Sequence, residues 1–266
     1  MSGALVLGAV AYDAKVVPIW DGFRAYFAAR DLAFDYVLYT NYERQVDAQL
    51  RGEVDVAWNS PLAWIDVAAR RRDAQAIAMR DTDRDLTSVV LVRDSGPIRA
   101  LGDLRGKRVG VGAADSPQAT LIPLVELAEA GIDVQPVRHD VLLGKHGDHI
   151  GGERDAVKAL LAGDVDAACV IDGNHVAFAR EGLFAPNALR AIHHTGRYDH
   201  CNMTVLGELS PQLARFRELL LAMSYDDPAV RPLLDLEGLK AWLPGRTTGY
   251  ALLARAVERF GHPGRR

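Results

Sequence analysis

Two hydrophobic patterns alternate along the chain, namely short apolar runs and longer stretches with one apolar face. Short runs bounded by turn residues are typical of buried strands, whereas apolar residues three and four positions apart indicate amphipathic helices. Trp20, Phe23 and Phe27, for example, fall on one face of a predicted helix. In the first 92 residues the patterns predict strands at 4–10, 34–39, 54–58, 75–80 and 87–92, and helices at 17–30, 42–51 and 61–71.

A second alternating set follows. Its expected strands are 109–112, 134–138, 167–171, 189–193 and 202–206, and its expected helices are 120–130, 153–161, 175–180, 211–223, 228–234, 237–242 and 248–260. Because strands alternate with helices, we expect an α/β protein of two lobes, each a mainly parallel sheet flanked by helices. The sequence lacks a long linker, so we expect two crossing strands to join lobe 1 (1–93 plus 202–266) to lobe 2 (94–201).

Composition narrows the class of protein. The 266 residues are 49% hydrophobic and 25% charged, and the net charge of −4 argues against a nucleic-acid partner. Two cysteines are too few for a disulfide scaffold, and the apolar runs are too short to predict membrane insertion. The sequence starts with Met-Ser-Gly and has no basic leader, which predicts a cytoplasmic location, or a periplasmic one if an export leader was removed.

Polar side chains follow the predicted strands, where ligands bind in open parallel sheets. They are Tyr12, Asp13, Asn59, Ser60, Asp115, Ser116, Gln118, Thr120, Asp172, Asn174 and His175, with Tyr42, Arg44 and Arg154 in the first turns of predicted helices. Hydroxyls, amides and arginines suit a small polar anion. Each residue taken alone is better explained as a helix cap or a turn residue, and it is their shared position at strand ends that favours a ligand site.

The stretch from Leu101 to Asp133 is the best candidate for an anion site. It reads as loop, strand, loop and helix, and the second loop carries the polar residues between Asp115 and Thr120. A helix N-terminus offers unpaired N–H groups and the positive end of the helix dipole. We therefore expect this loop to hold the anionic group of a ligand.

Histidines are concentrated in one half of the chain and suggest an alternative. Seven of the eight lie between His139 and His200. A metal site or an acid–base cluster with His149, His175, His200 and Cys201 is one interpretation, with Cys201 as a nucleophile. Solvated histidines and an inert buried thiol are the other. No spacing matches a zinc motif or a phosphate-binding glycine loop, so we expect no metal and no cofactor.

Four segments together resemble a known family. They are LRGEVDVAWNSPLAW, LTSVVLVRDSGPIRALGDLRGKRVGVG, the Ser-Pro-Gln-Ala-Thr loop, and ERDAVKALLAGDVDAACVIDG, in that order. They resemble the phosphonate/phosphite-type solute-binding proteins of ABC transporters over roughly residues 4 to 260. The resemblance implies a type 2 periplasmic-binding-protein fold, whose lobes close on a ligand by a hinge at the crossing strands.

The resemblance also implies roles for particular residues. An oxyanion would be held by the loop from Asp115 to Thr120, and first-lobe contacts would come from Tyr12, Tyr42 and Asn59–Ser60. Arg154 would take the position before the second-lobe helix, where the family often has histidine. The acidic residue after the next strand would be Asp172.

These observations give one main hypothesis and one alternative. The main hypothesis is a binding protein for a small-molecule ligand that is phosphonate-like or amino-acid-like, with an ABC transporter permease as a potential partner. Because Asp115 stands where a hydroxyl is expected, an amine-bearing acid is included. The alternative is a decarboxylase- or lyase-type enzyme on the same fold that acts on a small carboxylate.

Overall fold

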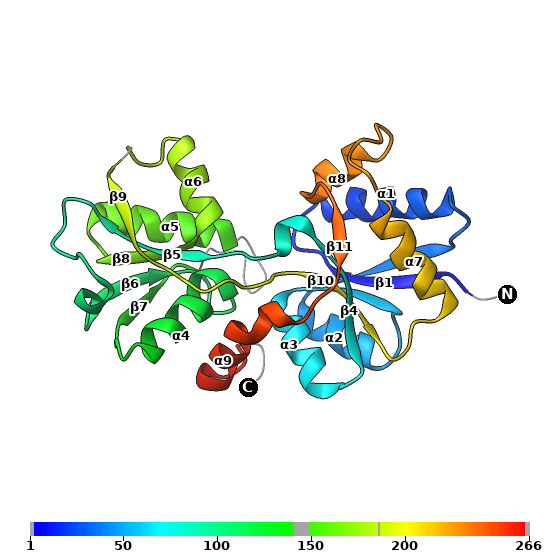
Figure 1. Cartoon of the computed structure of the whole chain (residues 1–266), viewed down its shortest axis with the longest axis horizontal. Coiled ribbons are helices and arrows are strands. Elements are labelled where there is room, and N and C mark those ends of the chain that lie inside the picture. Colours follow the sequence, from blue (N-terminus) through cyan, green and yellow to red (C-terminus); the bar gives the residue numbers. More distant parts are fainter. Residues whose placement is uncertain (1–2, 141–148, 186, 264–266) are drawn as a thin grey trace. The chain divides into compact units, whose positions relative to one another are not determined.

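The computed structural model describes residues 3–140, 149–185 and 187–263, with side chains from residue 151 onward in the second range. Contacts divide the chain into unit 1 (residues 1–84 and 199–250) and unit 2 (residues 85–198 and 251–266). The chain therefore passes three times from one unit to the other (Figure 1). Among the described residues, no helix combines the length and the apolar character that crossing a bilayer requires.

Unit 1 is built on a six-stranded sheet in the order β11-β4-β10-β3-β1-β2. Its strands are β1 (Leu5–Val10), β2 (Phe34–Tyr39), β3 (Val56–Asn59), β4 (Ala74–Arg80), β10 (Asn202–Leu206) and β11 (Trp242–Pro244). Its helices are α1 (Val16–Ala28), α2 (Tyr42–Leu50), α3 (Pro61–Arg70), α7 (Pro211–Leu221) and α8 (Arg231–Glu237). β1 to β4 run in one direction, and β10 and β11 run against them.

The main core of unit 1 lies on the face of the sheet that α1, α7 and α8 cover (Figure 1). The predicted aromatic face of α1 is buried there, and Phe27 lies 4.9 Å from Phe34 and 5.0 Å from Phe216 between ring centroids. A smaller cluster that includes Val46 and Val67 packs α2 and α3 on the other face. Burial of two faces explains why the strands are nearly continuous apolar runs.

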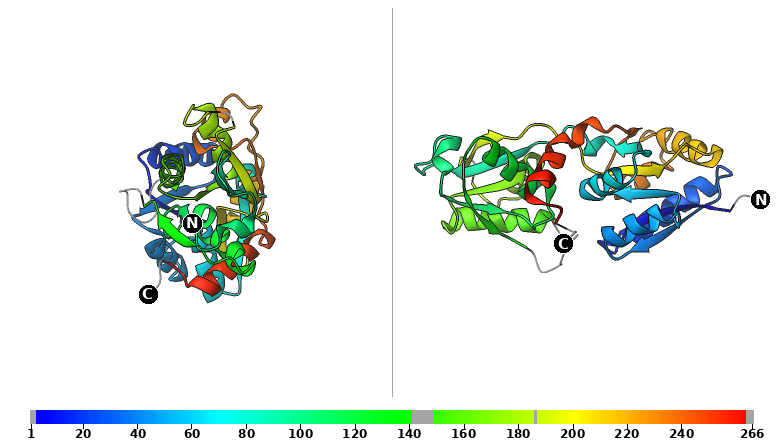
Figure 2. Two further views of the ribbon diagram at one scale, coloured as in Figure 1. Left: turned by 90° about the vertical axis from the view of Figure 1, so that its left-hand side faces the viewer. Right: turned by 90° about the horizontal axis from the view of Figure 1, so that it is seen from below.

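Unit 2 has a five-stranded sheet in the order β7-β6-β8-β5-β9. Its strands are β5 (Ser88–Arg93), β6 (Arg108–Val111), β7 (Gln135–Arg138), β8 (Ala167–Ile171) and β9 (Leu189–His194), and its helices are α4 (Ile122–Glu129), α5 (His149–Ala162), α6 (Asp172–Arg180) and α9 (Ala251–Phe260). Along β5, Val89 packs toward α5 and α6, whereas Val90 packs in the cluster that contains Leu127 of α4. Helices thus cover both faces of this sheet (Figure 2).

The expected two-lobed α/β architecture is confirmed, but both sheets are mixed rather than mainly parallel, since five of the nine pairings between the described strands are antiparallel. The unit limits differ from the lobes predicted above. β5 pairs with β8 and β9 and so belongs to unit 2, which moves the first crossing from the predicted 93/94 to 84/85. The C-terminal helix α9 contacts α4 and also belongs to unit 2, although the sequence pattern assigned it to lobe 1.

The helix predicted at 237–242 is wrong. α8 ends at Glu237 because Gly238 takes a left-handed conformation with φ of 80°. Trp242–Pro244 then pairs antiparallel with β4 as an edge strand. Proline is tolerated there because an edge strand leaves N–H positions that need no partner.

The second and third crossings are tied together inside unit 1. The backbone N–H of Asp199 donates to the carbonyl of Gly249 at 3.0 Å, and Arg246 binds both Asp199 carboxylate oxygens at 2.5 and 2.6 Å. A Cβ atom at Gly249 would lie 2.1 Å from Cγ of Asp199, so only glycine fits at this position. The chain segments that enter and leave unit 1 here are thereby held side by side.

Candidate functional site

Unit 1 gathers polar side chains at the carboxyl ends of its parallel strands, as the sequence pattern predicts. Tyr12 follows β1, and Tyr42 opens α2 after β2. Loss of hydration beside neighbouring protein atoms raises the pKa of Tyr12 to about 12, although this residue is 46% exposed, and it raises the pKa of Tyr42 well above its usual value. Both tyrosines lie within electrostatic reach of Arg80, which ends β4. The two phenols therefore stay neutral and can donate hydrogen bonds.

Other predicted residues of this edge hold the unit itself together. Asn59 is fully buried, and its amide is shared between Gln45, which donates to Oδ1 at 2.7 Å, and Gln49, which accepts from Nδ2 at 3.3 Å. Ser60 caps α3 by accepting from the backbone N–H of Ala63 at 3.3 Å. Asp13 accepts from a nearby backbone N–H, and Arg44 lies in the first turn of α2.

Sequence reasoning missed the most strongly charged part of this edge. Arg80 binds Asp83 through two hydrogen bonds of 2.6 and 2.9 Å, and its Nη1 lies 3.3 Å from the Glu237 carboxylate. The side chains of Asp83 and Glu237 are 2% and 4% exposed. The guanidinium also lies over the Trp58 ring, 5.2 Å from its centroid. Arg80 therefore bridges two buried carboxyl groups with a single positive charge.

The guanidinium lowers the pKa of both carboxyl groups, but their net pKa shifts are opposite. The pKa of Asp83 falls to about 2, because the attraction of Arg80 and hydrogen bonds from Arg80 and His200 outweigh burial. The pKa of Glu237 rises to about 7, because burial outweighs the single contact with Arg80. Glu237 thus changes its charge near neutral pH.

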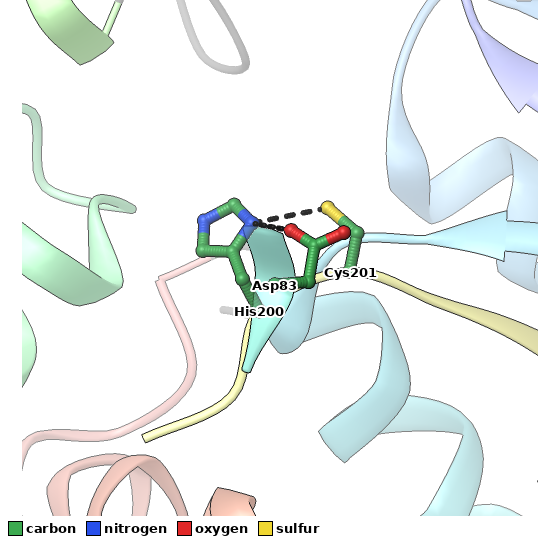
Figure 3. A group of neighbouring side chains, drawn as sticks. All are labelled: Asp83, His200 and Cys201. Carbon is green, nitrogen blue, oxygen red and sulfur yellow. Dashed lines mark hydrogen bonds and ion pairs between the residues drawn. The ribbon is translucent and has the colours of Figure 1, made fainter. Parts of the chain in front are cut away.

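His200 and Cys201 lie beside Asp83 in unit 1 (Figure 3). Nδ1 of His200 lies 3.1 Å from the Cys201 thiol and 3.5 Å from Asp83 Oδ1. A nucleophile–base–acid relay needs both ring nitrogens, whereas here both partners face the same one. Burial also raises the pKa of the thiol well above its usual value, so Cys201 is not a reactive thiolate.

The remaining candidates of the enzyme alternative do not join this pair. His175 lies in unit 2, where its ring stacks on Phe184 at 5.8 Å. The side chain of His149 lies outside the described residues. The alternative of a decarboxylase- or lyase-type enzyme is therefore not supported.

In unit 2 the predicted loop, which we call the cradle (residues 113–121), lies after β6. Its last part, Pro117–Leu121, is a π-helical turn that runs into α4, so the helix predicted at 120–130 begins three residues early. Ser116 caps this turn by accepting from the backbone N–H of Ala119 at 3.2 Å, and Thr120 Oγ1 donates to the Ala113 carbonyl at 2.8 Å. Both hydroxyls point into the loop.

Two further side chains of the cradle are buried. Asp115 and Gln118 are only 5% and 6% exposed. Oε1 of Gln118 is buried and has no hydrogen-bond partner among the described residues. A buried acceptor without a partner costs on the order of 1–3 kcal/mol, so its retention needs an explanation.

The other predicted unit 2 residues lie on α5 and α6. Asp172 is its first residue, and Asn174 donates to the fully buried Glu153 at 2.9 Å. Arg154 binds Glu181 at 2.6 Å and lies over the Phe178 ring at 4.4 Å. Arg154 is thus held by an acid and an aromatic ring of its own unit, and its contact with a ligand stays a prediction.

Comparison with solved structures supports the fold. The chain is similar to PhnD1 from Prochlorococcus marinus in complex with methylphosphonate, with a TM-score of 0.69, 17% identity, and 97% and 98% of the two chains covered. It is similar to XAC2383 from Xanthomonas citri bound to ATP, with a TM-score of 0.73, 20% identity and the same coverage. A third similar structure is the phosphonate transporter binding protein PA3383 from Pseudomonas aeruginosa, with a TM-score of 0.61, 14% identity, and 98% and 87% coverage. The shared fold is that of type 2 periplasmic binding proteins.

Comparison with protein families extends this likeness from fold to function. The family model described as "ABC transporter, phosphonate, periplasmic substrate-binding protein" matches residues 10–250. The match covers most of the chain and includes the strand-end residues of both units. The chain therefore belongs to the family of phosphonate substrate-binding proteins of ABC transporters, as the resemblance in its sequence implies.

Proposed function

We propose that the protein binds a small oxyanion, phosphonate-like in shape, and that the unit 2 cradle holds the anionic group. The observation that carries this proposal is the combination of polar groups in the cradle. Ser116 Oγ accepts from the Ala119 N–H, which leaves its own proton unused in that bond, but the residue is fully buried and would have to turn outward to donate to a ligand oxygen. Gln118 Oε1 adds a buried acceptor without a partner among the described residues, so the cradle can both donate and accept.

This mixture of donor and acceptor predicts which anions are selected. A phosphonate monoanion carries a P–OH group that can donate to Gln118 Oε1, whereas a sulphonate has no proton at neutral pH. A sulphonate would leave the buried oxygen unpaired and would lose the free energy of that hydrogen bond. An amino-acid-like ligand could meet the same acceptor with its ammonium group.

The ligand class can be tested by isothermal titration calorimetry. The probes are methylphosphonate and ATP, which are the ligands bound in two of the similar structures. Methanesulphonate and glutamate serve as comparisons. We expect methylphosphonate to bind at least ten times more tightly than methanesulphonate. Equal affinities for these two anions would contradict the proposed role of Gln118.

Replacement of Gln118 by leucine separates a binding role from a structural one. We expect the variant to bind methylphosphonate about tenfold more weakly, corresponding to about 1.5 kcal/mol for a lost hydrogen bond to a charged ligand. We expect its ligand-free form to unfold at an unchanged or higher temperature, because an unpaired buried acceptor is removed. Calorimetry and thermal unfolding check the two effects.

The control for this variant is Gln135→Leu. Gln135 is exposed at the start of β7, the opposite end of the same sheet from the cradle. It should change neither affinity nor unfolding temperature. A Gln118→Leu protein that loses stability and keeps its affinity would assign Gln118 to the fold alone.

Tyr12, Tyr42, Asn59 and Ser60 remain our proposed unit 1 contacts, and Asp172 a further contact in unit 2. These proposed contacts are supported by the position of the residues at or after the carboxyl ends of the strands. Closure of the lobes on the ligand stays a prediction. We also propose an ABC transporter permease as the partner. The family is described as periplasmic, and cell fractionation would test this location against the cytoplasmic one expected from the first residues.

A further inference from the structure

Asp83, His200 and Cys201 converge on one point in unit 1 (Figure 3). One ligand atom of each residue lies within 4.8 Å of the other two. Asp83 lies in the short turn after β4, and His200 and Cys201 precede β10. The backbone N–H of His200 donates to the Asp83 carbonyl at 2.8 Å, which fixes the two segments against each other.

The distances between these side chains are close to those of a small metal centre. Tetrahedral zinc with bonds of about 2.0–2.3 Å places its ligand atoms about 3.3–3.8 Å apart. Nδ1 of His200 lies 3.1 Å from Cys201 Sγ and 3.5 Å from Asp83 Oδ1. Small side-chain rotations would therefore bring all three atoms to bonding distance of one ion.

The contacts of Cys201 and Asp83 with His200 also favour a role in metal binding over a role in proton transfer. Sγ of Cys201 and Oδ1 of Asp83 both face Nδ1 of the imidazole. A metal ion takes one nitrogen from a histidine and lies between that atom and the other ligands. A set of sulfur, nitrogen and oxygen donors suits zinc and the neighbouring divalent transition metals.

Charged groups around the cluster fit a divalent ion. Arg80 binds both carboxylate oxygens of Asp83, Oδ2 through Nε at 2.6 Å and Oδ1 through Nη2 at 2.9 Å, and Oδ1 also lies 3.5 Å from Nδ1 of His200. On binding, the ion would displace the thiol proton to solvent. Its two positive charges and that of Arg80 would then balance the thiolate, Asp83 and an ionised Glu237. A buried site of this kind is stable only when such charges cancel.

We propose that Asp83, His200 and Cys201 bind one divalent transition-metal ion of the zinc type. Three protein ligands leave a fourth position open to water or to a ligand atom. This site is independent of the proposed anion cradle in unit 2. It also replaces our sequence-based expectation of no metal, because the sequence spacing does not reveal that Asp83 lies beside Cys201.

Cobalt titration tests the proposal. Protein without a histidine tag is freed of metal with a chelator and titrated with Co²⁺, whose bond to a thiolate gives a near-ultraviolet charge-transfer band. We expect one Co²⁺ per chain, displacement by Zn²⁺, loss of the band in Cys201→Ser, and at least tenfold weaker binding in His200→Ala. Cys169→Ala, which removes the buried thiol of unit 2, should keep the band.

A measurement on the unmodified chain covers the case in which the variants fail to fold. X-ray absorption at the zinc edge of the loaded protein should show one sulfur ligand with nitrogen and oxygen ligands. A spectrum without sulfur, absence of the cobalt band at excess metal, or a band that persists in folded Cys201→Ser would each overturn the proposal. If the unmodified protein shows the cobalt band but does not bind methylphosphonate, the result contradicts the proposed anion cradle and leaves the metal site supported.

Discussion

Replacement of Arg80 by alanine is expected to lower the free energy of unfolding by about 3–5 kcal/mol. The substitution leaves Asp83 and Glu237 buried with no guanidinium between them, and an unpaired buried charge is much more costly than an exposed one. It also removes the contact with Trp58 and the hydrogen bond to the Glu237 carbonyl. Chemical denaturation of the metal-free protein measures the effect.

Arg71→Ala is the matched control for this prediction. Arg71 binds both carboxylate oxygens of Asp73 at 2.6 and 2.8 Å, but their side chains are 40% and 45% exposed. Exposed ion pairs contribute about 0–1 kcal/mol, so this variant should remain close to the parent protein. If both arginine variants were destabilised equally, the charge cluster at Arg80 would not be a special source of stability.

Stability should also fall as the pH rises from about 4.5 to about 7, with Glu237 as the main cause. The pKa of this carboxyl is about 7 in the folded protein, against a usual value of 4.5. The folded state therefore holds a proton that the unfolded state has released, and folding is favoured at the acidic end of this window. Over this pH window the pKa difference of Glu237 corresponds to a loss of at most about 3 kcal/mol in the free energy of unfolding.

Glu237→Gln should remove this part of the pH dependence. The neutral amide resembles the protonated acid, so the variant and the parent protein should diverge in stability mainly above pH 4.5. Denaturation curves at half-unit pH intervals with a chelator present measure this difference. Glu53→Gln, at an exposed carboxylate whose pKa is lowered by Arg51, should leave the same window unchanged. Parallel curves for Glu237→Gln and the parent protein would contradict the assignment.

Local patterns were sufficient for most of the fold and for the cradle. Strand ends, caps and the Ser116–Thr120 loop depend on neighbours a few residues away, and such signals are present in the sequence itself. The edge strand β11 was missed because three residues are too short to show a period and Pro244 is a poor strand former. The cluster at Arg80 was missed because Glu237 lies 157 positions away.

The same reasoning explains the uneven result for the site residues. The strand-end rule selected Tyr12 and Tyr42, which lie within electrostatic reach of Arg80 and whose contact with a ligand stays a prediction. It equally selected Asn59 and Ser60, whose contacts hold α2 and α3 in place. Sequence position indicates where a side chain lies in a parallel sheet, but only its partners show whether the fold has already used its hydrogen bonds.

The three crossings of the chain impose an order on its folding during synthesis. β10 lies in the middle of the unit 1 sheet, between β3 and β4, yet it is made after the whole of residues 85–198. Until it emerges from the ribosome, β4 has no neighbour that joins it to β3. Unit 2 in turn lacks α9 until the last part of the chain is made. The final 68 residues therefore complete both units, and a nascent chain that stalls before them presents two open hydrophobic cores to chaperones and proteases.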